Sequence, residues 1–366
     1  MSDAPLVVIG AGGTGGHMFP AAAFAAEMKK RGWRVGLMTD ERGRKYTDGF
    51  EADWIINVKA ATFASKRPDK LISSGLKILA GIREAKAKLR QEGASLVAGF
   101  GGYPSFPAMR AGSALGLPVI IHEQNAVLGR VNRVFAKIAR IVACGFDRLD
   151  KLPASAKANK RVVGNPVREP IRKIGDLPYP AISETGAINL LVIGGSQGAR
   201  LFGEVIPKAV AQLSEGLRTR LNVVQQVREE QIEEVRAIYE KNGVSAHLSP
   251  FFSDMPDRLA NTHFVISRSG ASSVTELAVV GRPGLLIPLA IAMDDHQTGN
   301  AETLKSAGAA DVLSEAEFTA ENTARLLEDR LFDAEGLAAR AEAARSVAHV
   351  NAASDLADLA EGVLQK

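Results

Sequence analysis

The sequence predicts an α/β protein made of two Rossmann-like, doubly wound domains that face a shared cleft. Short apolar runs alternate with amphipathic stretches along both halves of the chain, as buried parallel strands alternate with helices. An opening of strand, glycine loop and helix occurs twice, with the loops GAGGTGG at 10–16 and GGSQGA at 194–199. The half-chain spacing of these openings predicts two similar domains.

Length and composition narrow the class of protein. A chain of 366 residues is too long for one ordinary core. A content of 46% hydrophobic and 23% charged residues is typical of a soluble globular protein. The net charge of +4 is small for a nucleic-acid binder. The single cysteine, Cys144, excludes an intramolecular disulfide and fits a reducing compartment.

The apolar runs locate the expected strands on both sides of a connection. Residues 153–180 hold five of the sixteen prolines and are interpreted as the link between the domains. The final stretch, 334–365, is alanine-rich and is expected to be helical. The expected strands are 6–9, 34–38, 54–58, 96–99, 118–122 and 140–143 before the link, and 189–193, 221–226, 244–248, 263–267 and 284–288 after it.

The first glycine loop predicts an anion-binding turn. Glycines let the backbone approach a charged ligand, and the following helix offers free N–H groups and the positive end of its dipole. The loop also satisfies the dinucleotide pattern GxGxxG, with Asp40 near the place of a ribose-binding acid, so an NAD-dependent oxidoreductase is an alternative. His17 follows this loop directly. It is interpreted as a residue that contacts substrate or, alternatively, as a structural histidine.

The segment SRSGASSVTE at 267–276 predicts a second anion site at a helix start. Ser272 and Ser273 lie in the first turn, and Glu276 is placed to accept hydrogen bonds from two neighbouring hydroxyls, as in a ribose. Alternatively, the serines cap the helix and Glu276 completes a capping box. Polar clusters at three other expected strand ends of this half favour a binding site.

One of these clusters, DDHQTGN at 294–300, is interpreted as a sugar-binding segment. Its two aspartates and its histidine are adjacent in sequence, and adjacent residues rarely converge on one metal ion. Gln297 and Asn300 lie about one helical turn apart and suit hydrogen bonding to sugar hydroxyls.

The segment 66–90 carries the basic excess of the chain, with a net charge of +6. Six leucines and isoleucines form a broad apolar stripe within it. A basic amphipathic helix of this kind can lie in the interface of an anionic membrane. Alternatively, the stripe faces the core and the lysines are solvated.

In combination, the motifs resemble those of the MurG family, which transfers N-acetylglucosamine to the undecaprenyl-linked muramyl peptide of the bacterial wall. They occur in order over nearly the whole chain. The matching motifs are GGTGGH at 12–17, GGY at 101–103, HEQN at 122–125, GNPVR at 164–168, GGSQGA at 194–199, RSGA at 268–271 with Glu276, and the segment 295–300.

The resemblance implies a GT-B fold, with an N-terminal domain 1–163 on the acceptor and membrane side and a C-terminal domain 164–340 for the donor. A last helix, 341–366, is expected to pack back toward the first domain. The implied reaction moves N-acetylglucosamine, with inversion, from UDP-N-acetylglucosamine to the 4-hydroxyl of undecaprenyl-diphosphate-linked N-acetylmuramyl pentapeptide (lipid I). The resemblance implies no cofactor, no metal and no nucleic-acid partner.

The resemblance also implies roles for individual residues. Glu276 binds the ribose, the backbone near Phe252 reads the uracil, and Gln297 contacts the sugar. Two positions depart from the family pattern: Phe252 stands where isoleucine is frequent, and His296 where some relatives carry glutamine. The full set of expected donor-binding residues is Thr14, Gly15, Gly16, Asn125, Arg168, Ser196, Phe252, Ala271, Ser272, Ser273, Val274, Thr275, Glu276, Gln297 and Asn300.

Because the implied acceptor is a membrane lipid, the resemblance favours the membrane interpretation of the basic segment. The protein is then expected to lie peripherally on the cytoplasmic face of the bacterial inner membrane, against an anionic surface. The residues expected at this surface are Leu71, Ile72, Leu76, Lys77, Leu79, Ile82, Arg83 and Lys86.

The implied mechanism is a single displacement in which a base takes the proton of the acceptor hydroxyl while UDP leaves. An imidazole changes charge near neutral pH, so His17 is the first candidate for the base and Glu123 the second. The alternatives are another GT-B enzyme that uses a UDP-sugar, such as an epimerase or a lipid glycosyltransferase, the NAD-dependent oxidoreductase, and a non-catalytic sensor of nucleotide sugars.

Overall fold

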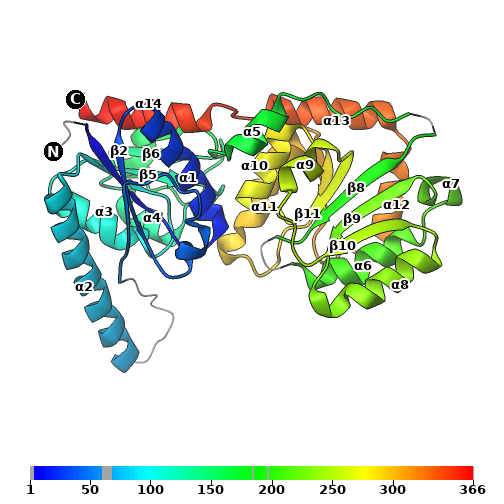
Figure 1. Cartoon of the computed structure of the whole chain (residues 1–366), viewed down its shortest axis with the longest axis horizontal. Coiled ribbons are helices and arrows are strands. Elements are labelled where there is room, and N and C mark those ends of the chain that lie inside the picture. Colours follow the sequence, from blue (N-terminus) through cyan, green and yellow to red (C-terminus); the bar gives the residue numbers. More distant parts are fainter. Residues whose placement is uncertain (1–3, 60–67, 184, 196–197, 366) are drawn as a thin grey trace. The chain divides into compact units, whose positions relative to one another are not determined.

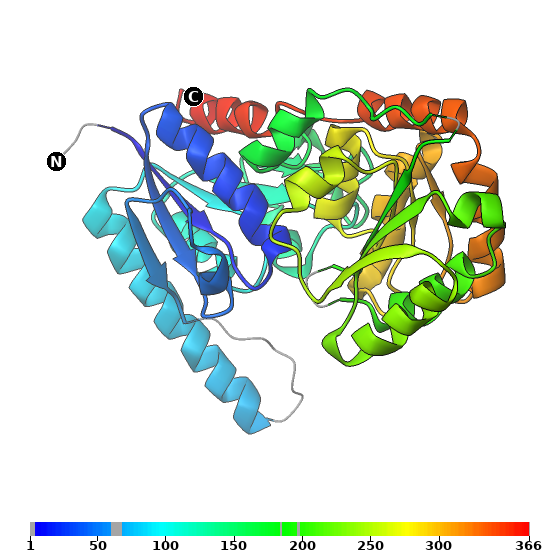
Figure 2. The ribbon, with the colours of Figure 1, turned by 45° about the vertical axis from the view of Figure 1, so that its right-hand side comes forward.

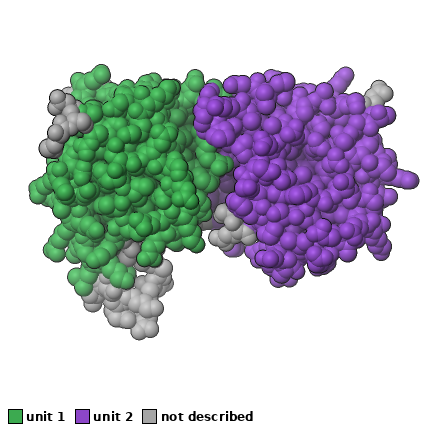
Figure 3. All heavy atoms as spheres, in the orientation of Figure 1, with its two compact units in different colours: residues 1–168, 349–366 green, residues 169–348 purple. Residues whose placement is uncertain are grey.

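The chain divides into two compact units, each an α/β domain built on one parallel sheet (Figures 1 and 3). The computed structural model describes residues 4–59, 68–183, 185–195 and 198–365, without the side chains of 68–73 and 293. Unit 1 comprises residues 1–168 and 349–366, and unit 2 comprises residues 169–348. The predicted fold class of two doubly wound parallel-sheet domains is confirmed.

The sheet of unit 1 has the strand order β3-β2-β1-β4-β5-β6-β7, and every neighbouring pair is parallel. Strand order reverses between β1 and β4, and ligands of open α/β sheets bind beyond the carboxyl ends of strands at such a point. The strands are β1 (Leu6–Gly10), β2 (Arg34–Thr39), β3 (Trp54–Asn57), β4 (Leu96–Gly99), β5 (Val119–Glu123), β6 (Ile141–Cys144) and β7 (Lys160–Val162).

Helices cover both faces of this sheet because its strands are apolar on both sides. Val7 and Ile9 of β1 enter one core cluster, and Leu6 and Val8 enter the cluster on the opposite face. Figure 2 shows the long helix α2 on the face opposite α1. The first face carries α1 (Gly15–Lys30) and α14 (Ala352–Leu364), and the second carries α2 (Pro68–Glu92), α3 (Ser105–Ala114) and α4 (Arg130–Phe135).

The sheet of unit 2 has the order β10-β9-β8-β11-β12-β13, again all parallel, and its order reverses between β8 and β11. The strands are β8 (Ile188–Ile193), β9 (Leu221–Gln226), β10 (Ser245–Ser249), β11 (Phe264–Ser267), β12 (Gly284–Leu286) and β13 (Ala310–Val312).

The helices of unit 2 also lie on two faces (Figure 1). The main core cluster packs Leu190 and Val192 of β8 against Phe202, Tyr239 and Leu327 from three helices of one face. These helices are α6 (Arg200–Val210), α8 (Ile232–Lys241) and α12 (Ala320–Leu331), and the remaining ones are α5 (Glu169–Gly175), α7 (Glu215–Arg218), α9 (Met255–Ala260), α10 (Ala271–Val280), α11 (His296–Ser306) and α13 (Ala334–Ser346). Four short 3-10 helices, 43–46, 154–159, 229–231 and 293–295, complete the described elements.

The C-terminal stretch forms two helices rather than the single expected one, because α13 ends at Ser346 and α14 begins at Ala352. Between them the chain returns to unit 1. Gly164 has a positive φ of 82°, and a Cβ built on it would lie 2.1 Å from the Cβ of His349. Glycine at this position therefore lets the returning chain pack closely.

An ionic cluster at the surface of unit 1 joins α14 to the end of α1. The Arg31 guanidinium donates to Glu27, Asp358 and Glu361 at 2.6–2.9 Å, and these hydrogen bonds raise its pKa although burial opposes the shift. Leu356 is fully buried in the same cluster as the first face of the sheet. The last helix is therefore part of the core of unit 1.

We expect Leu356→Ala to destabilise unit 1 by about 2–5 kcal/mol, because it opens a cavity in a packed core. Leu364→Ala on the same helix is the matched control, since Leu364 is 40% exposed. Chemical denaturation followed by circular dichroism measures both variants. Equal stability of the two variants would contradict the role of α14 in the core.

Candidate functional site

The first glycine loop lies at the carboxyl end of β1, where the strand order of unit 1 reverses. Thr14 is the N-cap of α1, and Gly15 and Gly16 form its first turn. Asp40 holds the loop, because its Oδ1 accepts hydrogen bonds from the backbone N–H groups of Gly13 at 3.0 Å and Gly43 at 2.8 Å. This carboxylate oxygen is therefore engaged by the backbone of its own unit.

His17 lies in the first turn of α1 and packs on the loop that follows β4. A Cβ on Gly101 would lie 3.1 Å from the imidazole Cε1, and a Cβ on Gly102 would lie 3.4 Å from Cδ2. Both glycines have a positive φ. The imidazole Nδ1 lies 2.9 Å from Oε1 of Gln124 at the end of β5. The reversal of strand order thus brings His17 to the motif HEQN.

Glu123 is 2% exposed, and its carboxylate accepts four hydrogen bonds. Oε1 accepts from the backbone N–H of Asn125 at 3.1 Å and from its side-chain amide at 3.2 Å. Oε2 accepts from the backbone N–H of Gly129 at 2.8 Å and from the Asn132 amide at 2.9 Å. Both oxygens therefore hold the turn between β5 and α4.

His122 is buried beneath this site, with Nε2 2.9 Å from the carbonyl oxygen of Gly164. Burial lowers its pKa from 6.5 to about 4, although the hydrogen bond to Gly164 opposes the shift. His122 is therefore neutral at physiological pH.

Arg168, another expected donor-binding residue, ends unit 1. Its guanidinium carbon lies 4.5 Å from the centre of the Phe19 ring. Phe19 belongs to α1, the helix that carries His17. Arg168 therefore lies beside the helix of the glycine loop.

In unit 2, the second glycine loop follows β8, at the reversal of strand order beside β11. Gln226 ties this loop to the end of β10, because its Oε1 accepts from the Gly194 N–H at 3.0 Å and its Nε2 donates to the Pro250 carbonyl at 3.1 Å. Ser196, expected at the diphosphate, lies outside the described residues.

The helix α10 begins at the same reversal of strand order, directly after β11. Gly270 is its N-cap, and the first turn of the helix contains no acidic side chain that would offset the positive end of its dipole. Ser272 and Ser273 are half-buried, as is Glu276 one turn further on. The other expected residues of this turn, Ala271, Val274 and Thr275, are buried.

The carboxyl end of α10 is anchored by the fully buried Arg282. Its guanidinium donates to the carbonyl oxygens of Leu259, Ala260, Val280 and Gly281 at 2.8–3.0 Å. Burial lowers the pKa of this arginine to about 10. These four bonds fix the carboxyl end of α10.

Phe252 is 6% exposed and packs under Arg258, whose guanidinium carbon lies 4.0 Å from the ring centre. The His247 ring lies on the same side chain, with 5.7 Å between centroids. The Phe252 ring is thus engaged in packing within unit 2.

Gln297 and Asn300 lie on α11, next to α10. Gln297 is half-buried and its Oε1 accepts from the Leu289 N–H at 3.0 Å. Asn300 is fully buried and donates to the Ser269 carbonyl at 3.1 Å. Asn300 thereby ties α11 to the turn before α10. Asp294 and Asp295, just before α11, have positive φ angles of 58° and 54°, a strained backbone for non-glycine residues.

The basic helix α2 exposes part of its apolar stripe. Leu76 is 63% exposed and Leu79 is 53% exposed. Lys77 and Arg83 are exposed, whereas Lys86 and Ile82 are half-buried and Ile82 packs against the core. The side chains of Leu71 and Ile72 lie outside the described residues.

The sequence analysis missed two exposed apolar residues on the same side of unit 1. Val134 of α4 is 58% exposed and Ile138, just after it, is 54% exposed. The helix α3 packs against both α2 and α4. Lys137 and Arg140 are exposed beside these residues. The periodicity of this short segment gave no signal, since a six-residue helix defines no stripe.

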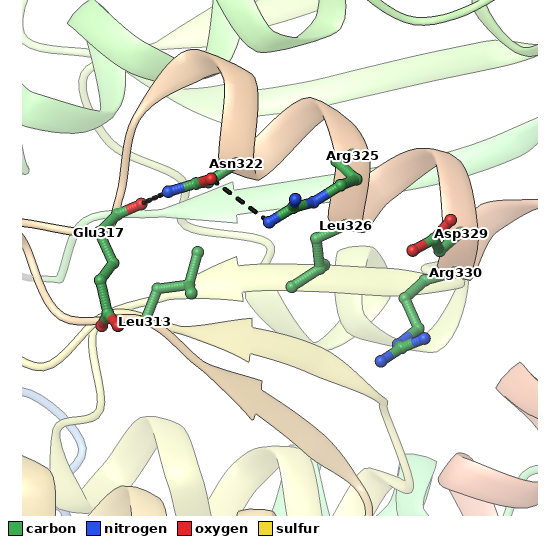
Figure 4. Close-up of a pocket in the computed structure, with 7 residues that line it drawn as sticks. All are labelled: Leu313, Glu317, Asn322, Arg325, Leu326, Asp329 and Arg330. Atoms are coloured by element: carbon green, nitrogen blue, oxygen red, sulfur yellow. Dashed lines mark hydrogen bonds between the residues drawn. The ribbon is translucent and has the colours of Figure 1, made fainter.

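Other features of the described residues do not add to these sites. No described helix is long and apolar enough to cross a membrane. No group of three His, Cys, Asp or Glu among the described residues could hold a metal ion. A groove in unit 2 contains none of the expected site residues (Figure 4); it is lined by Leu313, Glu317, Asn322, Arg325, Leu326, Asp329 and Arg330.

Comparisons with known proteins place the chain among glycosyltransferases. Residues 7–144 match the Glycosyltransferase family 28 N-terminal domain, and residues 189–360 match the corresponding C-terminal domain. The chain therefore contains both the N-terminal and the C-terminal domain of this glycosyltransferase family. The alternative of an NAD-dependent oxidoreductase is not supported.

Individual relatives cover nearly the whole chain. A transferase of Maricaulis maris, named UDP-N-acetylglucosamine–N-acetylmuramyl-(pentapeptide) pyrophosphoryl-undecaprenol N-acetylglucosamine transferase, is 48% identical over 98% of this chain and 97% of its own. The equally named protein of Caulobacter vibrioides is 49% identical over 97% and 98%. The crystal structure of Acinetobacter baumannii MurG is 31% identical, with a TM-score of 0.80 over 98% and 99%.

The depressed pKa of His122 makes the stability of unit 1 depend on pH. Below pH 6.5 the unfolded chain binds a proton at this residue, whereas the folded protein binds it only near pH 4. The contribution of the neutral His122 to the free energy of unfolding is therefore fully present above pH 6.5. This contribution, about 3 kcal/mol, is lost as the pH falls toward 4. We expect His122→Gln to lose this part of the pH dependence. Urea denaturation of both proteins between pH 4 and 7 measures the difference, and parallel pH profiles would contradict it.

Proposed function

Because the chain belongs to the MurG family of glycosyltransferases, we propose that it transfers N-acetylglucosamine from UDP-N-acetylglucosamine to the 4-hydroxyl of undecaprenyl-diphosphate-linked N-acetylmuramyl pentapeptide. The names of the relatives give this donor and acceptor. The observation that carries the proposal is the pair of glycine loops, each at the point where a parallel sheet reverses its strand order.

The donor binds to unit 2 in this proposal. The start of α10 offers its N–H groups and the hydroxyls of Ser272 and Ser273 to the diphosphate. Glu276, one turn further, accepts hydrogen bonds from the two ribose hydroxyls. The backbone of Phe252 reads the uracil edge, which fits the packed position of its ring. Gln297 contacts the sugar, and the fully buried Asn300 acts by holding the turn at Ser269.

Leaving-group charge is stabilised by fixed dipoles in this arrangement. UDP gains negative charge on the diphosphate as the bond to the sugar breaks, and pre-oriented N–H groups stabilise such charge. Arg282 keeps α10 in place through its four carbonyl contacts. Ser196 of the second glycine loop is proposed to contribute a further hydroxyl.

Unit 1 supplies the acceptor side and the base. Thr14, Gly15 and Gly16 present the first glycine loop, and Asn125 and Arg168 complete the donor-binding set. His17 is the proposed base, because Glu123 already accepts four hydrogen bonds through both carboxylate oxygens. Taking up a proton at Glu123 would break part of that network, whereas the imidazole accepts a proton on a lone pair.

We further propose that unit 1 docks on the anionic cytoplasmic surface of the inner membrane, where the lipid acceptor resides. The exposed leucines of α2 and the exposed Val134 and Ile138 supply apolar contact. The exposed Lys77, Arg83 and Lys137 supply attraction to anionic headgroups. The protein would be bound peripherally, through this surface.

The reaction is tested by UDP release from UDP-N-acetylglucosamine with and without the lipid-linked muramyl peptide. We expect release to depend on the acceptor. His17→Ala should lower kcat by about 10²–10⁴-fold, because proton transfer is lost, with little change in UDP affinity. Glu276→Ala should instead raise KM for the donor. Release without acceptor dependence would contradict the proposed acceptor, and full turnover of His17→Ala would contradict the proposed base.

Membrane docking is tested by co-sedimentation with vesicles that contain anionic lipid. We expect the double variant Leu76→Ser/Leu79→Ser to lose most of its vesicle binding while its UDP binding is kept. Phe332→Ser is the matched control, since Phe332 is 53% exposed but belongs to unit 2. Equal sedimentation of the double variant and the wild type would contradict the proposed surface.

A further inference from the structure

A chain of hydrogen bonds runs from the backbone of Gly164 to the imidazole of His17. The His122 Nε2 lies 2.9 Å from the Gly164 carbonyl oxygen, and the His122 Nδ1 lies 3.0 Å from the Gln124 Nε2. The Gln124 Oε1 lies 2.9 Å from the His17 Nδ1. His122 and Gln124 are each 1% exposed, so no bulk water competes for these bonds.

The orientation of the Gln124 amide is fixed by a backbone carbonyl. Its Nε2 lies 3.1 Å from the carbonyl oxygen of His122, a group that can only accept. The nitrogen of the amide must therefore face this carbonyl, and its two N–H groups serve the His122 oxygen and the His122 Nδ1. A flipped amide would set an oxygen against an oxygen in a buried site.

The tautomer of His122 agrees with this orientation for an independent reason. The Gly164 carbonyl only accepts, so the Nε2 of His122 carries the proton. Because burial keeps His122 neutral, its Nδ1 holds a lone pair and accepts from Gln124. The backbone carbonyls of Gly164 and His122 thus set the same direction of donor and acceptor along this series of hydrogen bonds.

We propose that Gln124 is a positioning residue that fixes the proton of His17 on Nδ1 and leaves the lone pair on Nε2. With its nitrogen committed to His122, the amide presents only Oε1 to His17, and an oxygen acceptor requires an N–H donor. Among the described residues, none hydrogen-bonds the His17 Nε2. In water an imidazole carries its proton mainly on Nε2, so this arrangement reverses the usual preference.

The consequence concerns the proton-transfer step and rests on the proposed role of His17 as base. The acceptor 4-hydroxyl gives its proton to the Nε2 lone pair, its oxygen forms the bond to the anomeric carbon, and the bond from that carbon to the diphosphate oxygen breaks with its electron pair leaving on UDP. The imidazolium then keeps its Nδ1–H bond to Gln124. The ring exchanges its proton at Nε2 alone.

The test is the tautomer of His17 in the wild-type protein, read by heteronuclear NMR on isotope-labelled histidine. The signal is assigned as the one that His17→Gln lacks. We expect the neutral ring to carry its proton on Nδ1. A ring that carries its proton on Nε2 would overturn the proposal, whatever the outcome of the activity assays.

The variant Gln124→Met tests the consequence, because methionine keeps the size of the side chain and removes the acceptor. We expect the Nε2–H tautomer of His17 to become the main one and kcat to fall about tenfold or more, with UDP binding unchanged. Gln225→Met is the matched control, since Gln225 is also buried and hydrogen-bonded, to Tyr239 and Phe202 in unit 2. An unchanged tautomer of His17 in Gln124→Met would overturn the proposal. A changed tautomer with an unchanged kcat would count only against the role of His17 as base.

Discussion

The parallel pairing of β1 with β4, and of β8 with β11, is the constraint on which the sites of this protein depend. In each sheet the other neighbours of these two strands lie on opposite sides of the pair. The connections that follow the two strands therefore turn away from each other at the carboxyl edge of the sheet. At their start, the loop that follows one strand meets the loop that follows the other. The glycine loops, His17 and the start of α10 lie at these two points, and the turn at Gln124 follows β5, the next strand beside β4.

Much of this architecture could be predicted from the sequence because the strands are buried on both faces and therefore read as apolar runs. The expected segments 96–99 and 221–226 coincide with β4 and β9. Two strands, β7 and β13, were missed. Each has three residues at the edge of its sheet, and each carries charged side chains, as in Lys160 and Asp311. A short edge strand buries too little to leave a pattern.

The residues of the candidate site were predictable as motifs, but their hydrogen-bond partners were not. Gln124 meets His17 across 107 residues, and Asn300 meets Ser269 across 31. Such contacts arise only once the sheet has formed, so no local sequence pattern predicts them. The sequence analysis predicts that Asn300 binds a ligand, and the fold adds that its amide donates to the buried carbonyl of Ser269. Glu123, named as a second base, similarly satisfies two backbone N–H groups.

The return of the last helix to unit 1 has a consequence for the order in which the protein is made. A ribosome releases residues 169–348 before residues 352–364, so unit 2 has its complete sequence while unit 1 still lacks α14. Domains generally fold as units during synthesis, the N-terminal one first. Here the nascent N-terminal domain must wait, with the apolar surface that Leu356 will cover still open to water. Its folding can be completed only after the residues of α14 have left the ribosome.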